Sequence, residues 1–208
     1  MGVVAITSTQ GLLGGLNLRI VNTAIGLMRS GRDELIIAGE RGHVFARGQR
    51  VPFTTFPGII DEQKDAQAEA LRNYLFKKAV NGTYGSLKVV YPSATTLASQ
   101  RVEIATFLPF SPEKTNQPSL DLSQTIVETS PAKMLEYLVF LLMGHRLKEI
   151  FSLSRLAELG ARYMHLEDSG QKIQELNQKL RIRYFRMRHE AIDQSMRELF
   201  AARSLYAG

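Results

Sequence analysis

The sequence predicts an α/β fold, a mostly parallel sheet of five strands with helices on its faces, followed by one long C-terminal helix. Strand-like and helix-like segments alternate through the first 110 residues, as expected when helices join parallel strands. After Pro131 there is no further proline, and glycine occurs only at Gly144, Gly160, Gly170 and Gly208. We therefore predict an α/β domain over residues 1–110, a linker over 111–130 and a long helix over 131–208.

Five short apolar runs are the expected strands of the sheet. They are Val3–Ile6, Leu35–Ala38, Val51–Phe53, Leu87–Tyr91 and Val102–Phe107. The third run is the weakest and suits an edge of the sheet, because Pro52 cannot donate a hydrogen bond to a neighbouring strand. No helical pattern separates the last two runs, so we expect that pair to be antiparallel.

Two helices are expected between these strands. Apolar residues recur on one helical face from Leu18 to Met28, and Gly31 is the expected stop. A second helix is predicted from Asp61 to Val80, with Asp61 as its N-terminal cap and the pair Asn81-Gly82 as its end.

Composition marks the linker and the start of the long helix. Residues 111–130 are rich in Pro, Ser, Thr, Asn and Gln, which is typical of a solvated connection. Ser130 supplies an N-cap oxygen, and Pro131 stands at the first helical position, where its missing N–H costs nothing. A helix from there to about residue 204 would extend roughly 100 Å.

Apolar residues near the end of this helix form a stripe. They recur at Leu176, Leu180, Tyr184 and Met187 and then at Ile192, Met196 and Leu199, in each group at the three- and four-residue steps of a coiled-coil seam. A lone helix gains little from propensity, and the sequence has no second helical segment of comparable length. We therefore expect another polypeptide to cover the stripe. The alternative is a helix end that folds back on the sheet, and the dense apolar run from Met134 to Phe151 supports it more for the section before Gly170 than for the section after it.

Composition and charge narrow the function. The absence of cysteine excludes a disulfide scaffold, a thiolate metal site and a cysteine nucleophile. A net charge of +6 favours an acidic partner, whether nucleic acid, an anionic membrane or an acidic protein surface. The most apolar run, Tyr137–Met143, is shorter than the roughly 20 residues of a membrane span, so we expect a soluble protein.

The sequence gives only weak signals for a small-ligand site or a catalytic site. The glycine-rich turn Gly11–Gly15 precedes a helix, whose N-terminus attracts phosphate. Its spacing is not Gly-x-Gly-x-x-Gly and no acidic residue ends the second strand, so we favour a structural turn. The four histidines, His43, His145, His165 and His189, lack metal-ligand spacing. We expect no cofactor, no metal and no catalytic residue.

A nucleic-acid-binding module is the alternative from another functional class. The basic segment Arg181–Arg188 carries Tyr184 and Phe185 among its arginines, as base stacking requires. Because Tyr184 also falls on the apolar stripe, we favour its burial in a coiled coil.

Several motifs together resemble one family. The stretch GLLGGLN from Gly11 to Asn17 resembles the signature Ser-Asp-Arg-Gly-Leu-Cys-Gly-Gly-Leu-Asn of the gamma subunit of F-type ATP synthases. Ala38–Gly42 parallels that family's Ile-Gly-Ser-Lys-Gly, and Glu128–Pro131 parallels its Glu-Pro-Asp-Pro. The C-terminal part of the chain aligns with the family without a gap. There, Glu158 and Ala161-Arg162 align with its Ser-Glu-x-x-Ala-Arg motif, and Tyr184–Leu199 aligns with its C-terminal helix motif. The resemblance covers essentially the whole chain.

The resemblance implies a rotor shaft. Gamma subunits have a Rossmann-like domain at the base of a two-helix coiled coil, which turns inside a ring of alpha and beta subunits and performs no catalysis. The implied partners are the alpha and beta subunits, the epsilon subunit, the membrane rotor ring and a separate helix to pair with the C-terminal helix, with no nucleic acid. The implied location is the cytoplasmic face of a membrane or its organellar equivalent. Arg188, His189 and Gln194 are implied to contact loops of the beta subunits.

The sequence also departs from the family. Gln171–Ile173 replaces an Asp-Asn-Ala segment, Leu13 replaces the cysteine of the glycine turn, and His189 stands where the family has glutamine. The chain begins where the family's first strand begins, so the N-terminal helical arm is missing. We therefore expect a divergent member without that arm.

Overall fold

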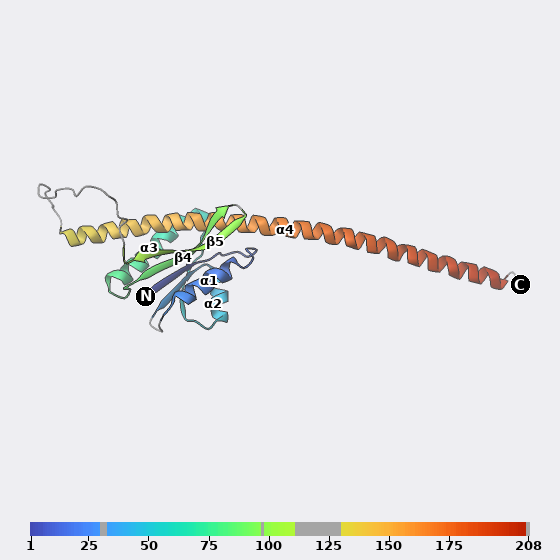
Figure 1. The fold of residues 1–208 in the computed structure, drawn as a ribbon, viewed down its shortest axis with the longest axis horizontal. Coiled ribbons are helices and arrows are strands. Elements are labelled where there is room, and N and C mark those ends of the chain that lie inside the picture. The colour runs from blue at the N-terminus through green and yellow to red at the C-terminus, as the bar shows by residue number, and fades with distance from the viewer. Residues whose placement is uncertain (30–32, 97, 111–129, 207–208) are drawn as a thin grey trace. The chain divides into compact units, whose positions relative to one another are not determined.

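The computed structural model of the chain describes residues 1–29, 33–96, 98–110 and 130–206, the last four of these by their backbone alone. The elements follow in the order drawn in Figure 1: β1 (Gly2–Ile6), α1 (Leu16–Leu27), β2 (Glu34–Ala38), α2 (Glu40–Gly48), β3 (Phe53–Phe56), the 3-10 turn η1 (Asp61–Gln63), α3 (Lys64–Val80), β4 (Leu87–Thr96), β5 (Ser99–Leu108) and α4 (Pro131–Tyr206).

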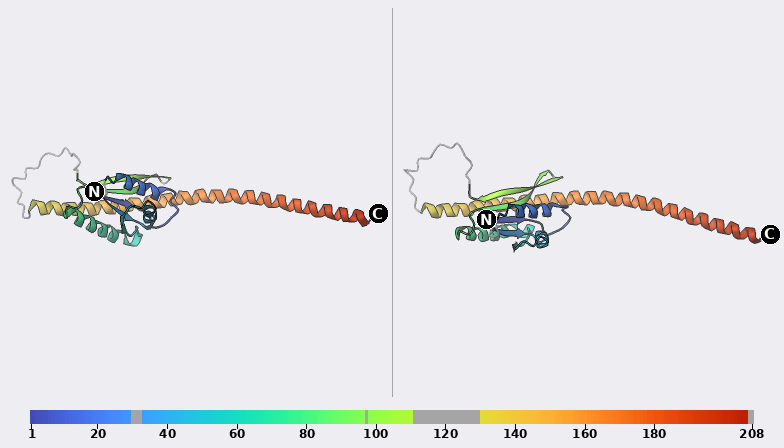
Figure 2. Two further views of the ribbon diagram at one scale, coloured as in Figure 1. Left: turned by 90° about the horizontal axis from the view of Figure 1, so that it is seen from below. Right: turned by 60° about the horizontal axis from the view of Figure 1, so that its bottom comes forward.

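The strands form one sheet in the order β3-β2-β1-β4-β5. The first four strands are parallel, and β5 returns antiparallel to β4 as a long hairpin, seen from two further sides in Figure 2. This confirms the predicted Rossmann-like, mostly parallel sheet and its antiparallel last pair. The chain crosses from one side of β1 to the other between β3 and β4, which is the topology of doubly wound α/β sheets.

Each face of the sheet has its own apolar core, because successive side chains of a strand point to opposite faces. Val3 and Ala5 of β1 belong to the core built with α1 and α2. Val4 and Ile6 belong to the core built with α3 and with the first half of α4. The central strand is therefore buried on both sides, and every residue of β1 is buried.

The start of α4 agrees with the sequence prediction. Pro131 is its first residue, and the N–H of Lys133 donates to Ser130 Oγ at 3.4 Å. Further along, Met143, Leu147, Ile150 and Phe151 are at most 3% exposed and pack into the core beside α3. Ala161 is buried in the core of the other face. The return onto the sheet, weighed as the alternative for the section before Gly170, is therefore confirmed as far as Ala161.

The chain divides into two compact units, Met1–Met164 and the residues from His165 onward. The predicted division at residues 110 and 131 stays a prediction. Residues 111–129 of the predicted linker lie outside the described residues, as does Gly31. Helix α1 ends earlier than Gly31, at Leu27, with Met28 as its C-cap.

Three local predictions differ from the structure. The strand expected at Val51–Phe53 begins at Phe53 instead, because Pro52 has no N–H for the ladder. Helix α2 was not predicted, since it is only nine residues long and contains Gly42 and Gly48, and glycine is a poor helix former. Asp61 does not cap α3: residues 61–63 form η1 with no side-chain cap, and the Asp61 carboxylate pairs with Arg155.

Candidate functional site

The second unit is a helix with an uncovered surface. Every side chain from Gln171 to Ala202 is exposed. Its large apolar side chains keep between 41% (Phe185) and 67% (Leu199) of their surface. Most of the stability of helices in proteins comes from packing of an apolar face, and apolar surface of this extent marks an interaction site. All seven predicted seam positions belong to this exposed set: Leu176, Leu180, Tyr184, Met187, Ile192, Met196 and Leu199.

These seam positions do not share one face of the helix. Successive residues of an α-helix are turned by about 100°, so the five-residue step from Met187 to Ile192 carries the apolar row about 140° around the axis. Because the helix is continuous across this step, these apolar residues form two stripes, and the coiled-coil pairing of the predicted seam stays a prediction.

We name the two stripes by their exposed apolar residues. Stripe 1 lies within an arc of about 80° and comprises Leu166, Ile173, Leu176, Leu180, Tyr184 and Met187. Stripe 2 lies within an arc of about 100°, centred about 150° from stripe 1, and comprises Ile182, Phe185, Ile192, Met196, Leu199 and Phe200. The stripes overlap along the axis from Ile182 to Met187.

The three predicted partner-binding residues are exposed but are not brought together. Arg188, His189 and Gln194 point in directions roughly 100° to 140° apart. His189 lies on the face of stripe 2, and Gln194 lies on the face of stripe 1. Gln194 Nε2 donates to Glu198 Oε1 at 3.1 Å. One small partner surface cannot contact all three side chains.

A belt of positive charge surrounds the overlap of the two stripes. It comprises Lys179, Arg181, Arg183, Arg186 and Arg188. In the part of the chain that the structure describes, ion pairs involve other residues and none joins a carboxylate to this belt. The Arg181 guanidinium lies 5.8 Å from the centre of the Phe185 ring. The belt is therefore open to acidic groups from outside the helix.

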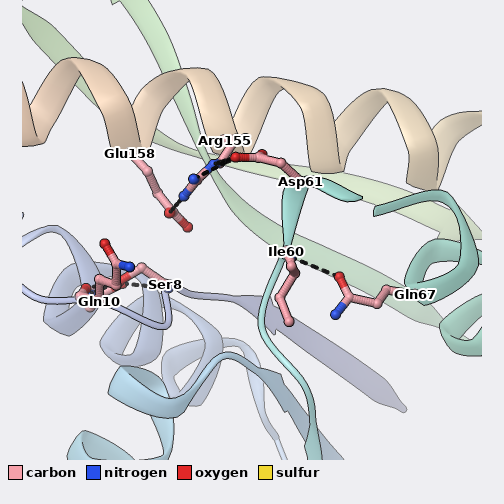
Figure 3. A network of polar contacts seen from close by, with 8 residues as sticks. Ser8, Gln10, Ile60, Asp61, Gln67, Arg155 and Glu158 are labelled. Carbon is pink, nitrogen blue, oxygen red and sulfur yellow. Dashed lines mark hydrogen bonds and ion pairs between the residues drawn. The ribbon is translucent and has the colours of Figure 1, made fainter. Parts of the chain in front are cut away.

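An ion-pair network holds the first half of α4 in place (Figure 3). Arg155 Nη2 lies 2.7 Å from Asp61 Oδ2 of η1, and its Nη1 lies 3.2 Å from Glu158 Oε2 on the next turn of α4. The Glu158 side chain is 3% exposed, whereas that of Asp61 is 56% exposed. Arg155 thus clamps α4 to η1, 94 residues away in sequence.

In this network the pKa values of Asp61 and Glu158 shift in opposite directions. The hydrogen bond from Arg155 holds the pKa of Asp61 below its usual value. Burial raises the pKa of Glu158 above its usual value, although Arg155 and Arg162 nearby oppose that shift. A buried carboxylate with this environment is stable only while its cation stays in place.

The glycine-rich turn after β1 uses its polar groups internally. The N–H of Ser8 donates to Asn17 Oδ1 at 3.1 Å, and Asn17 Nδ2 donates to Ser8 Oγ at 2.8 Å. Ser8 Oγ in turn donates to the carbonyl of Gln10 at 2.7 Å, as Figure 3 shows. These bonds tie the turn to the first turn of α1, which supports its interpretation as a structural turn.

Among the described residues, no group of three or more His, Asp or Glu side chains could hold a metal ion. No helix in the same ranges has the length and hydropathy of a membrane span.

Comparisons with known proteins identify the family. Residues 1–204 match a family model described as ATP synthase. The ATP synthase gamma chain of Chlorobium phaeobacteroides is 26% identical over 216 residues, which cover 99% of this chain and 73% of the relative. That of Clostridium acetobutylicum is 26% identical over 199 residues, covering 94% of this chain and 69% of the relative.

Solved structures share the fold. The rotor of the Euglena gracilis mitochondrial ATP synthase in rotational state 1 gives a TM-score of 0.70 at 18% identity, covering 92% of this chain and 74% of that one. A Euglena gracilis structure described as OSCP/F1/c-ring, in rotational state 3, gives 0.72 at 16% identity, covering 98% and 72%. With the family model and the relatives above, these findings show that the chain belongs to the ATP synthase gamma-chain family.

Proposed function

We propose that this chain is the rotor shaft of a rotary ATP synthase. It transmits torque between an ion-driven membrane ring and the catalytic ring of alpha and beta subunits, and it catalyses no reaction itself. The observation that carries the proposal is the helix beyond His165, whose stripes and basic belt are uncovered in a gamma-chain family member. A shaft needs a stiff helical element that neighbouring subunits grip along its length.

The partners follow from this role. The alpha and beta subunits surround the helix, and a separate helix covers stripe 1. The epsilon subunit and the membrane rotor ring contact the α/β unit. Structures with this fold are described as a rotor and as an assembly with F1 and c-ring, which supports these assignments. The chain then works at the cytoplasmic face of a membrane, or at the equivalent face inside an organelle.

Within the basic belt, Arg188 is our strongest candidate for contact with acidic loops of the beta subunits. His189 and Gln194 face other directions and serve other contacts of the same ring. The comparisons give no support to the nucleic-acid alternative.

Reconstitution tests the proposal. The chain is coexpressed with the alpha and beta subunits of its own organism, and copurification and ATP hydrolysis are measured. We expect a complex whose formation is weakened by Arg188→Asp, since the new carboxylate repels acidic loops of the beta subunits, and is unchanged by Gln171→Asp at an exposed polar position of the same helix. Failure of the unsubstituted chain to copurify with either subunit contradicts the proposal.

A further inference from the structure

A row of polar side chains on α4 binds α3 and η1 in one antiparallel register. The members on α4 are three or four residues apart, so they share one face of the helix. As they advance along α4, their partners move back through α3 into η1. The contacts are Lys148 Nζ to Glu69 Oε1 at 2.9 Å, Ser152 Oγ to Lys64 Nζ at 3.1 Å and Arg155 Nη2 to Asp61 Oδ2 at 2.7 Å. The last of these is drawn in Figure 3.

Arg72 of α3 continues this row toward the start of α4. Its guanidinium carbon lies 3.9 Å from the centre of the Phe140 ring. The same side chain crosses α4 at Gly144, where an added Cβ would stand 3.0 Å from the Arg72 Cδ and Nη1 atoms. Arg72 therefore fills a notch that only glycine leaves open. We name these contacts, from Phe140–Arg72 to Arg155–Asp61, the α3–α4 row.

The α3–α4 row restricts a motion that the apolar core restricts less. Met143, Leu147 and Phe151 pack beside α3 and oppose its separation from α4. Hydrophobic attraction is non-directional, so it opposes rotation of α4 about its own axis less strongly. Hydrogen bonds weaken steeply as their angle falls, and an arginine with two bonds to one carboxylate adds geometric specificity. Packed helices can move past each other by one turn, and a shift of about 5.4 Å would break every contact of the row at once.

No other element shares this role among the described residues. Every ion pair that joins α4 to another element there ends on α3 or η1. In the proposed function, torque enters at the α/β unit and leaves along α4. The torque therefore crosses the contact of α4 with α3 and η1.

We propose that the α3–α4 row is the joint that locks α4 to the α/β unit under load. Asp61, Glu69 and Arg72 are positioning residues, which keep α4 in rotational register while the shaft turns. The inference rests on the proposed function for the origin of the load. The lock itself is a property of this chain and can be measured on it alone.

Single-molecule pulling on the full chain measures the lock. The chain has no cysteine, so Ala70→Cys on α3 and Tyr163→Cys on α4, both at exposed positions, attach the handles. In this background, Asp61→Ala combined with Glu69→Ala removes two contacts at half-exposed side chains. At constant force, the lifetime of docked α4 should fall by about two- to thirtyfold.

A matched control removes the same charge elsewhere. Glu40 and Glu62 are exposed, and neither joins α4 in the ion pairs of the described ranges. Glu40→Ala combined with Glu62→Ala should leave the lifetime unchanged. The inference is overturned if the lifetime of the Asp61 and Glu69 variant equals that of the parent, or if the control shortens it equally.

The assembled complex gives a second readout, the ratio of ATP-driven ion pumping to ATP hydrolysis in vesicles. Asp61→Ala with Glu69→Ala should preserve hydrolysis and lower this ratio, because α4 turns without carrying the α/β unit. A covalent bridge separates the lock from general stability. With Glu69→Cys and Lys148→Cys added to Asp61→Ala, a short reducible bismaleimide should restore the ratio, and its reduction should lower the ratio again. A ratio that ignores the bridge contradicts the inference.

The two readouts separate this inference from the proposed function. If the unsubstituted chain couples pumping to hydrolysis and the Asp61 and Glu69 variant couples equally well, the lock is refuted and the shaft role stands. If the pulling results agree with expectation but the unsubstituted chain never joins the alpha and beta subunits, the lock stands and the shaft role fails.

Discussion

Replacing Arg155 by methionine tests whether the ion-pair network holds α4 on the sheet. Methionine keeps much of the aliphatic packing but leaves the Glu158 carboxylate buried without its hydrogen-bonded cation. Removing one partner of a buried pair costs about 3–5 kcal/mol. Since the Arg155 side chain is 21% exposed and Arg162 adds a second nearby cation, we expect about 2–3 kcal/mol. The corresponding fall in Tm is about 4–12 °C for a unit of this size.

The loss should depend on pH through Glu158. Burial raises its folded-state pKa above the unfolded value of about 4.3. A carboxyl group with a raised folded-state pKa lowers the free energy of unfolding as pH rises through that interval. Without Arg155 the folded-state pKa rises further, so the Arg155→Met variant should lose more stability at pH 8 than at pH 5. A second substitution, Glu158→Gln, removes the buried charge and should restore most of the loss.

The assay is urea unfolding at pH 5 and pH 8, followed by near-ultraviolet circular dichroism of tyrosine. Tyr84 and Tyr91 are buried in the α/β unit, so their signal reports on that unit more than on fraying of the exposed helix. The reasoning is refuted if Arg155→Met unfolds like the unsubstituted chain, if its deficit is equal at both pH values, or if Glu158→Gln does not restore stability in the double variant.

Three further predictions concern the sheet unit. Burial alone would raise the pKa of Glu34, but hydrogen bonds from Tyr74, Tyr84, Lys78 and Thr54 outweigh it and lower that pKa to about 2. Urea titrations should therefore show that the free energy of unfolding decreases as pH falls from about 4.5 toward 2. The Glu34→Gln variant should lack this acid-dependent loss of stability. Gly39→Ala should cost at least about 1–3 kcal/mol, because φ is 105° and a Cβ would overlap the carbonyl of Thr7; an unchanged urea midpoint would contradict this. Phe151→Ala should lower the free energy of unfolding by about 3–5 kcal/mol, since Phe151 is 2% exposed. Comparison of the Tm of the variant with that of the unsubstituted chain measures this loss. A loss under about 1 kcal/mol would contradict the packing of α4 against the sheet.

Much of the fold could be predicted from local signals. β-branched runs marked β1 and β2, and the lack of a helical pattern between Leu87–Tyr91 and Val102–Phe107 indicated the antiparallel pair. Ser130 followed by Pro131 located the start of α4 to the residue. These features depend on neighbours in sequence, which is why residue order alone reveals them.

The rest depends on contacts between distant residues. Arg155 and Asp61 are 94 residues apart, and no spacing rule pairs them. Helix α2 is held by the close approach of Gly42 to Thr7, whose Oγ1 accepts the Gly42 N–H at 3.1 Å. The two separate apolar stripes, in contrast, could have been predicted from the sequence alone, because the five-residue step from Met187 to Ile192 is visible there.

The central claim is that the helix beyond His165 is completed by other polypeptides. Hydrogen exchange of residues 165–202, measured by mass spectrometry, tests it directly on the isolated chain and on the chain assembled with alpha and beta subunits. The account predicts rapid exchange throughout this segment in the isolated chain and strong protection after assembly. A monomeric chain already protected there, or an assembled one that stays unprotected, would contradict it.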